Sequence, residues 1–236
     1  HDGQLQAVAD EITAMGRQSL AIKTDISQKS EVDALVAQAK EAFGAIDILM
    51  NVAVRYHRKS LLELDDADWD ELTNVNLKGY WLMHQAVAPI MQAQGGGSII
   101  NLTSRGGLKA HADKGMGNYA IVKAGVAMMT RQYSRYLGPY NVRVNAIAPS
   151  LVEWEQHPAG DFYRENPDHV PTQPKSAPLE PSEQEKFEAW STGPESLPLG
   201  RVATFEEMAN AAVFLASDAS SYVTCLLYTS PSPRDR

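Results

Sequence analysis

The sequence contains a single cysteine, Cys225, which excludes an internal disulfide bond and a metal site built from cysteines. It also lacks an uninterrupted apolar stretch long enough to cross a bilayer. Positive charge is scarce, because 21 lysines and arginines face 29 acidic residues. The resulting net charge of −8 argues against nucleic acid or an anionic membrane as the main partner. We therefore expect a soluble domain that binds neither, and the absence of disulfide chemistry favours the cytoplasm.

The amino-acid composition is typical of a globular protein. Hydrophobic residues make up 44% and charged residues 21% of the 236 residues, which suits a single domain with one sizeable core. The histidines are scattered without the spacing of metal ligands, so no metal site is expected at His57, His84, His111, His157 or His169.

Apolar residues at helical spacing predict several amphipathic helices. The first helix ends near Gly16, and the second begins with a capping box at Ser30 and Asp33 and ends at Gly44. Further helices are expected from Asp65 or Asp66 to Gly95 with an interruption at Pro89, over residues 118–137, and from a cap formed by Thr204 and Glu207 to Leu215.

Apolar runs between these helices predict strands at residues 46–53, 98–102 and 142–148, with a shorter run at residues 20–22. The strands lack polar alternation, which is typical of a parallel sheet buried on both faces. The expected fold class is therefore α/β: a doubly wound parallel sheet in three layers (α/β/α), Rossmann-like, with ligands at the carboxyl ends of the strands.

One region interrupts this alternation. Nine of the 13 prolines lie between Pro149 and Pro198, interspersed with aromatic residues. A long irregular excursion after the carboxyl end of a strand favours a substrate lid over residues 153–195, and a surface insertion without a catalytic role is the alternative.

Tyr119 and Lys123 form the main candidate for catalysis. On a helix they lie on one face, so that the ammonium group can approach the phenol and lower its pKa. The pair alone is also compatible with an ordinary surface pair. Ser104 follows the strand at residues 98–102, where its hydroxyl could hold a substrate oxygen, although a turn-forming serine is the simpler interpretation. A serine hydrolase lacks support, because the chain has no Gly-x-Ser-x-Gly motif.

Taken in order, several short motifs resemble the short-chain dehydrogenase/reductase family, in its compact single-domain branch. The similarity extends from about residue 5 to Thr224. It rests on Asp47-Ile-Leu-Met-Asn-Val-Ala53, Asn74-Val-Asn-Leu-Lys-Gly79, Gly97-Ser-Ile-Ile-Asn-Leu-Thr-Ser104, Tyr119-x-x-x-Lys123, Val142-Arg-Val-Asn-Ala-Ile-Ala-Pro149, Leu199-Gly-Arg201 and Phe214-Leu-Ala-Ser-Asp218.

The resemblance implies an NAD- or NADP-dependent oxidoreductase that interconverts an alcohol and a carbonyl compound by hydride transfer. Tyr119 would be the general acid/base, Lys123 would lower its pKa and bind the nicotinamide ribose, and Ser104 would orient the substrate oxygen. Asn76 would hold a water that links Lys123 to solvent. The helices that contain Trp81 and Met128 would form the interface of a homo-oligomer, a dimer or tetramer.

By the same resemblance, six residues are expected to bind the cofactor beside Tyr119 and Lys123: Asp25 and Ile26 at the adenine, Asn51 and Ala53 along a strand end, and Pro149 and Val152 at the carboxamide. Two departures predict local changes. Val54 replaces the family's glycine next to the cofactor, and Trp154 replaces a threonine, which suggests a reshaped substrate pocket.

The family's first strands and its glycine-rich phosphate-binding turn have no counterpart in residues 1–236, and neither does the residue that distinguishes NAD from NADP. We expect the single domain to cover residues 1–224, without the first strands and the last strand, and residues 225–236 to be a non-native tail. Two alternatives to an active enzyme are an inactive fragment and a non-catalytic binding or regulatory member of the same fold.

Overall fold

The fold is built around one parallel sheet. The computed structural model describes residues 2–56, 59–108, 117–150 and 201–229, together with Val152 and Leu199. Its strands are β1 (Ile48–Asn51), β2 (Gly97–Leu102), β3 (Val142–Ala148) and β4 (Leu227–Thr229). They pair in the order β1-β2-β3-β4, and every pair is parallel. The prediction of a parallel α/β sheet is thus confirmed, with strands that all end at one edge.

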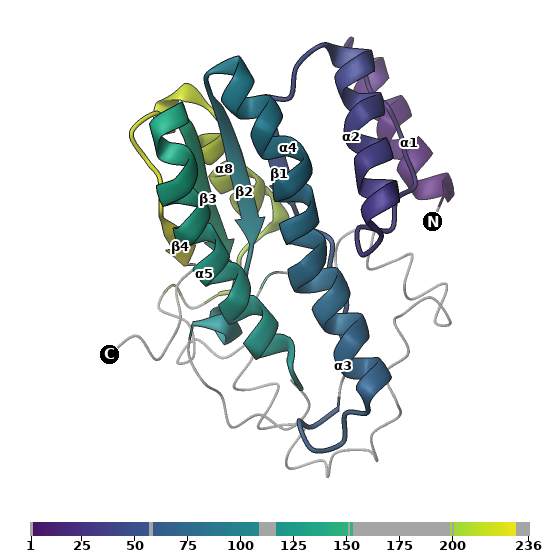
Figure 1. The fold of residues 1–236 in the computed structure, drawn as a ribbon, viewed down its shortest axis with the longest axis vertical. Coiled ribbons are helices and arrows are strands. Elements are labelled where there is room, and N and C mark those ends of the chain that lie inside the picture. The colour runs from purple at the N-terminus through teal and green to yellow at the C-terminus, as the bar shows by residue number, and fades with distance from the viewer. Residues whose placement is uncertain are drawn as a thin grey trace.

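Helices cover both faces of the sheet. They are α1 (Asp2–Ala14), α2 (Lys29–Phe43), α3 (Asp66–Thr73), α4 (Tyr80–Gln94), α5 (Tyr119–Leu137) and α8 (Phe205–Ala216). Figure 1 shows α4 and α5 in front of the sheet and α8 behind it. The molecule therefore has the three-layer, Rossmann-like architecture that the sequence predicts.

Neighbouring strand residues explain why the strands lack polar alternation. Ile99 and Ile100 point to opposite faces of β2, yet they are only 0% and 1% exposed. Ile99 joins a core cluster with residues of α2 and α4, whereas Ile100 packs with Ile147 of β3 and Leu215 of α8. Both faces of the strand are therefore core.

Two of the three expected helix caps form. Asp65 and Asp68 make a capping box at the start of α3, and Thr204 and Glu207 make one at the start of α8. The capping box predicted at Ser30 is wrong, because the N-cap of α2 is Gln28, two residues earlier, and it makes no side-chain cap bond. Ser30 therefore lies inside α2, whose buried residues are Val32 and Val36.

The interruption predicted at Pro89 is also wrong, since Pro89 lies inside the continuous helix α4. Val87, Ala88 and Met91 around it are buried, and this packing outweighs the one hydrogen bond that proline removes. The helical geometry changes earlier instead: residues Asn74–Gly79 form a π-helical turn between α3 and α4. Such turns are often found at functional sites.

The expectation that the last strand is missing is corrected by β4. Ala146 of β3 pairs with Leu227, and the backbone N–H of Cys225 donates to the carbonyl of Val144. Proline would remove a donor from such a ladder, but the strand ends at Thr229, before Pro231. An edge strand offers unpaired backbone groups that any proline-free extended segment can satisfy. Whether residues 225–236 are native stays a prediction.

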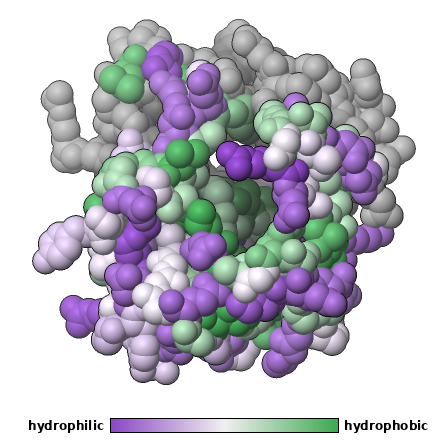
Figure 2. All heavy atoms as spheres, turned by 90° about the horizontal axis from the view of Figure 1, so that it is seen from above, coloured by the Kyte–Doolittle hydropathy of each residue, from purple (hydrophilic) through white to green (hydrophobic). Residues whose placement is uncertain are grey.

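The apolar run at residues 20–22 does not join the sheet, because residues 17–25 form neither helix nor strand. In the part of the chain described, β1 pairs only with β2, and Ile48 and Met50 are 50% and 42% exposed. Figure 2 views the end of the molecule opposite the carboxyl ends of the strands and shows a hollow with hydrophobic walls.

Among the described residues no helix is long and apolar enough to span a membrane.

The insertion predicted at residues 153–195 lies outside the described residues. Its flanks are described: Val152 and Ala203 form a parallel bridge. The chain on the two sides of the insertion therefore meets close to the end of β3.

Candidate active site

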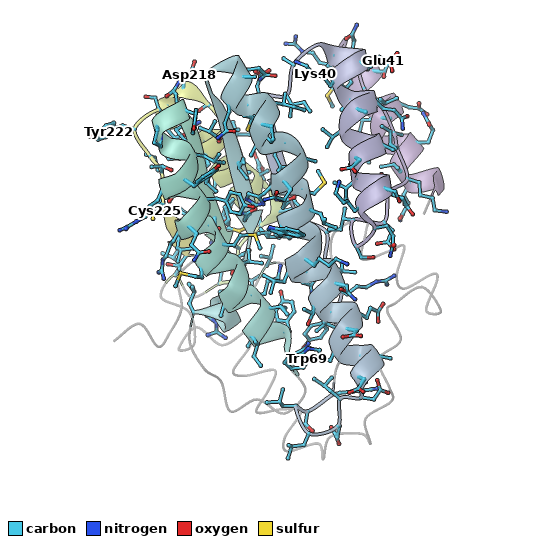
Figure 3. All side chains as sticks on the ribbon, in the orientation of Figure 1. Lys40, Glu41, Trp69, Asp218, Tyr222 and Cys225 are labelled. Atoms are coloured by element: carbon cyan, nitrogen blue, oxygen red, sulfur yellow. The ribbon has the colours of Figure 1, made fainter. Side chains whose placement is uncertain are left out.

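The predicted catalytic residues lie at the carboxyl end of the sheet. Ser104 lies two residues after the end of β2, and Tyr119 is the first residue of α5. Asn118 is the N-cap of α5, and its side-chain amide donates to the backbone carbonyl of Trp69 on α3 at 3.3 Å. Figure 3 shows Trp69 at the end of the molecule opposite Lys40 and Glu41. This contact fixes the start of α5 against α3, and so fixes Tyr119.

Ser104 and Tyr119 are brought together. The Ser104 side chain accepts a hydrogen bond from the backbone N–H of Gly106 at 3.2 Å. Burial raises the pKa of Tyr119, the nearby Ser104 side chain lowers it, and the neighbouring Tyr56 raises it. The largest of these effects is burial, so the phenol is held in its protonated form at neutral pH.

Lys123 lies one helical turn further along α5 and is 1% exposed. Its Nζ donates to the backbone carbonyl of Leu102 at 2.6 Å and lies 5.7 Å from the centroid of the Tyr119 ring. Burial lowers the pKa of Lys123 to about 8. The expected lowering of the Tyr119 pKa by Lys123 is not what this structure shows, because the ammonium is directed to Leu102 and burial of the phenol dominates.

Two contacts lock α5 against the turn after β2. The Thr103 hydroxyl donates to the backbone carbonyl of Lys123 at 2.6 Å. A Cβ atom on Gly107 would lie 2.5 Å from the carbonyl carbon of Lys123 and 2.7 Å from the nitrogen of Ala124. Only glycine therefore allows the turn that carries Ser104 to approach the helix backbone this closely. The register between Ser104 and Lys123 is set by backbone packing.

Asn76, the fourth predicted catalytic residue, is fully buried in the π-helical turn. Its Oδ1 accepts from the N–H of Arg55 and its Nδ2 donates to the carbonyl of Arg55, both at 2.8 Å. The side chain thus holds the loop that follows β1. A link from Asn76 through water to Lys123 stays a prediction.

The residues predicted to meet the adenine lie in a loop against the same π-helical turn. A Cβ on Gly79 would lie 2.7 Å from the side chain of Ile26 and 3.2 Å from its carbonyl oxygen, so this loop packs closely on the π-helical turn. Asp25 is exposed, and its carboxylate accepts from the N–H of Ser27 at 2.9 Å. Hydrogen bonds from Ser27 hold the pKa of Asp25 below its ordinary value.

The strand-end residues divide into buried and accessible ones. Asn51 is buried and its amide donates to Oδ1 of Asn101 at 2.9 Å, so its side chain is committed to the sheet interior. Ala53 and Val54 are exposed beyond the end of β1. Outside glycine, the described residues adopt a positive φ only at Asn141 and Cys225, so Val54 fits without the strain that replacing a glycine implied.

The last two predicted cofactor residues lie beyond β3. Pro149 is partly exposed, and its carbonyl accepts from the N–H of Arg105 at 3.1 Å. Val152 is partly exposed beside Ala203. Both therefore border the same edge of the sheet as Ser104.

Four residues of this site were not predicted from the sequence. Tyr56 makes an edge-to-face contact with Tyr119 at 5.3 Å between ring centroids. Tyr80 lies over Lys123, Thr103 anchors the helix and Asn118 positions its start. The position of Thr103 immediately before Ser104 was a usable signal. Nothing in the sequence alone marks Tyr56 or Tyr80, because their contacts depend on how loops and helices pack.

Comparison with known proteins agrees with this geometry. A family model described as short chain dehydrogenase matches residues 1–158. The chain belongs to the short-chain dehydrogenase/reductase family. Membership makes it an oxidoreductase of the nicotinamide-dependent kind.

Two relatives of this short-chain dehydrogenase/reductase illustrate the similarity. The 3-oxoacyl-acyl-carrier-protein reductase FabG of Thermotoga maritima is 34% identical over 200 residues, which cover 85% of this chain and 70% of the relative. The BbsD subunit of a hydroxy(phenyl)methylsuccinyl-CoA dehydrogenase of Thauera aromatica is 34% identical over 224 residues, covering 94% of this chain and 78% of the relative.

A solved structure extends the likeness to three dimensions. The structure of 7α-hydroxysteroid dehydrogenase complexed with NADH and 7-oxo glycochenodeoxycholic acid matches with a TM-score of 0.79 and 28% identity. The match covers 99% of this chain and 80% of that one. The arrangement of strands and helices is therefore that of a nicotinamide-binding dehydrogenase.

The residues on one side of the site fit a nicotinamide cofactor. Lys123 offers a buried ammonium group with three donors, of which one is directed to Leu102. Asp25 offers an exposed carboxylate near the π-helical turn, and Ala53 is exposed just beyond the end of β1. These groups suit the hydroxyl-rich parts of the cofactor. For the pyrophosphate, the described residues include no glycine-rich turn between a strand and a helix.

Proposed function

We propose that this dehydrogenase interconverts an alcohol and a carbonyl compound, using NAD or NADP, with Tyr119 as the general acid/base. The observation that carries the proposal is that the Ser104 side chain and the Lys123 ammonium group both lie beside Tyr119, with Lys123 Nζ 5.7 Å from the centroid of the Tyr119 ring. The three side chains come from the turn after β2 and from α5, and Thr103 and Gly107 fix this turn against α5.

In the direction of reduction, Ser104 donates a hydrogen bond to the substrate carbonyl oxygen and orients it towards Tyr119. The phenol then gives its proton to that oxygen. In oxidation the phenolate takes the proton from the alcohol, and the positive charge of Lys123 stabilises that phenolate. The nicotinamide ring supplies or accepts the hydride when the cofactor is bound. The raised pKa of Tyr119 in this structure matches the form that reduction requires.

We propose a small-molecule alcohol or ketone as substrate, and Asn76 as the residue that completes the proton route to solvent. Tyr56, in edge contact with Tyr119, would form one wall of the substrate site. The exposed Trp81 on α4 and Met128 on α5 support a homo-oligomer, a dimer or tetramer. A cytoplasmic location is proposed from the single cysteine, which allows no internal disulfide bond.

The proposal is tested by a dehydrogenase assay of the full-length protein with both cofactors over ketones and alcohols that include sugars, steroids and acyl compounds. Ser104→Ala should lower turnover by about 10²-fold, because the orienting hydrogen bond to the reacting oxygen is lost. Ser221→Ala, an exposed serine outside the site, should match the wild type. Equal turnover of the Ser104 and Ser221 variants would contradict the assignment.

The 236-residue polypeptide by itself is expected to bind NAD or NADP weakly. The diphosphate needs backbone N–H groups of a glycine-rich turn that joins a first strand to a helix, and in the part of the chain that the structure describes no strand with such a turn precedes α1. We expect no cofactor-dependent rise in its melting temperature. Under the same conditions the homologous 7α-hydroxysteroid dehydrogenase should rise by about 5–11 °C at a hundredfold excess over Kd. A comparable rise for residues 1–236 would show that another segment holds the diphosphate.

A further inference from the structure

Tyr80, the first residue of α4, is one of the largest fully buried side chains of the described part of the chain. It follows the π-helical turn directly and lies four residues after Asn76, which is also 0% exposed. Both side chains therefore point into the molecule from one side of the helix. The conversion of an alcohol and a carbonyl compound described above assigns no task to Tyr80.

The ring of Tyr80 faces the ammonium group of Lys123. The Lys123 Nζ lies over this ring at 5.1 Å from its centroid, closer than the 5.7 Å to the Tyr119 ring. The Tyr80 hydroxyl donates to the carbonyl of Leu102 at 3.4 Å, and Lys123 donates to the same carbonyl at 2.6 Å. The Tyr80 hydroxyl and the Lys123 ammonium group thus approach the same backbone oxygen at the end of β2.

We propose that Tyr80 is a positioning residue that holds Lys123 in its charged form and in place beneath Tyr119, through the face of its aromatic ring. An ammonium group within about 6 Å of an aromatic centroid is attracted by the ring's negative face, and the attraction is strongest where water is excluded. Here both partners are buried, with Lys123 at 1% and Tyr80 at 0% exposure.

The Tyr80 ring stabilises the ammonium form of Lys123 at a position where no negatively charged side chain does so. Among the described residues no carboxylate forms an ion pair with Lys123. The titratable groups that contact its ammonium are the phenols of Tyr80 on α4 and Tyr119 on α5, and the third neighbour is the Leu102 carbonyl on β2. Burial favours the neutral amine and lowers the Lys123 pKa to about 8. The ring face opposes that effect without adding a negative charge.

The part of Tyr80 that acts is the ring and not the hydroxyl. The hydroxyl–carbonyl distance of 3.4 Å is long for an O–H···O hydrogen bond, whereas the ring lies at a favourable distance from Nζ. Tyr80→Phe keeps the ring, and Tyr80→Leu removes it while the site stays apolar. The two variants therefore separate the ring from the hydroxyl.

The experiment follows the Lys123 side chain by NMR in the full-length protein labelled with 13Cε-lysine, with Lys123→Arg identifying the resonance. In Tyr80→Leu the pKa of Lys123 should fall by about one unit, because burial persists and the cation–π attraction is lost. In Tyr80→Phe it should stay close to the wild-type value. An unchanged pKa in Tyr80→Leu, or an equal fall in both variants, would overturn the proposal.

A second measurement needs no variant at Tyr80. Protons above an aromatic face resonate upfield, so the Hε protons of Lys123 should lie upfield of those of exposed lysines such as Lys78 in the wild-type protein. Hε protons of Lys123 at the position of exposed lysines would show that no ring face covers the ammonium group, even if Tyr80→Leu fails to fold.

The effect on turnover rests on the proposed function, and the titration does not. If the wild type oxidises an alcohol, Tyr80→Leu should lower that rate about tenfold more than Tyr80→Phe does, in line with a one-unit loss of Lys123 charge stabilisation. If no oxidation is found, the proposed function fails, while the NMR titration still decides whether Tyr80 controls Lys123.

Discussion

Tyr119→Phe is expected to lower turnover by about 10²–10⁴-fold, since this is the usual cost of losing a general acid/base. The ring stays, so its contacts with Tyr56 and Lys123 are kept and only the phenolic oxygen is removed. Cofactor affinity should change little, because the ammonium of Lys123 remains at the site. The measurement is kcat together with the Kd for NAD or NADP in the full-length protein.

Tyr136→Phe is the matched control for this variant. Tyr136 lies on the same helix, α5, but is 66% exposed and far along it from Tyr119. It loses the same hydroxyl without touching the site and should keep wild-type turnover. Wild-type turnover in Tyr119→Phe as well would exclude this tyrosine as the acid/base and with it the proposed mechanism.

The sequence predicted the sheet well where hydrophobicity alone decides. β2 and β3 are runs whose successive residues are buried on both faces, as with Ile99 and Ile100, so a lack of polar alternation is a direct signal. The position of Ser104 at the end of β2 and of Tyr119 at the start of α5 follows from these boundaries.

Features that depend on contacts between distant segments could not be predicted in this way. Whether Leu227–Thr229 forms a strand depends on a free edge of β3. The start of α2 at Lys29 leaves Ser30 inside the helix, where it cannot form the capping box. The direction of the Tyr119 pKa also depended on burial, which the Tyr-x-x-x-Lys spacing does not report. For the same reason Tyr80, 43 residues before Lys123, carried no local signal.

Gly107 illustrates such a long-range constraint, and its substitution is expected to have the second-largest effect. In Gly107→Ala the new Cβ would approach the carbonyl carbon of Lys123 to 2.5 Å, and neither this Cβ nor the backbone atom it meets can rotate away. The turn after β2 and the part of α5 around Lys123 must therefore separate. Overpacking of this kind costs about 1–3 kcal/mol, which corresponds to a melting temperature lower by about 2–12 °C in a domain of this size.

The loss of activity should exceed what this loss of stability explains. Separating the turn from α5 moves Ser104 away from Tyr119 and weakens the Thr103 bond to the Lys123 carbonyl. A displacement of about 1 Å in a positioned group lowers rates by about 10²-fold. We therefore expect Gly107→Ala to lose about 10²-fold in kcat at a temperature where it is still folded.

Gly138→Ala is the matched control for Gly107→Ala. Gly138 ends α5 with helical backbone angles, and a Cβ there would meet nothing within 4 Å. This variant should keep both the melting temperature and the turnover of the wild type. If Gly107→Ala also kept wild-type turnover, the close backbone packing would not be what holds Ser104 against Tyr119. If Gly107→Ala lost stability but not activity, the glycine would serve the fold alone, and the register of Ser104 and Lys123 would have to be set by Thr103.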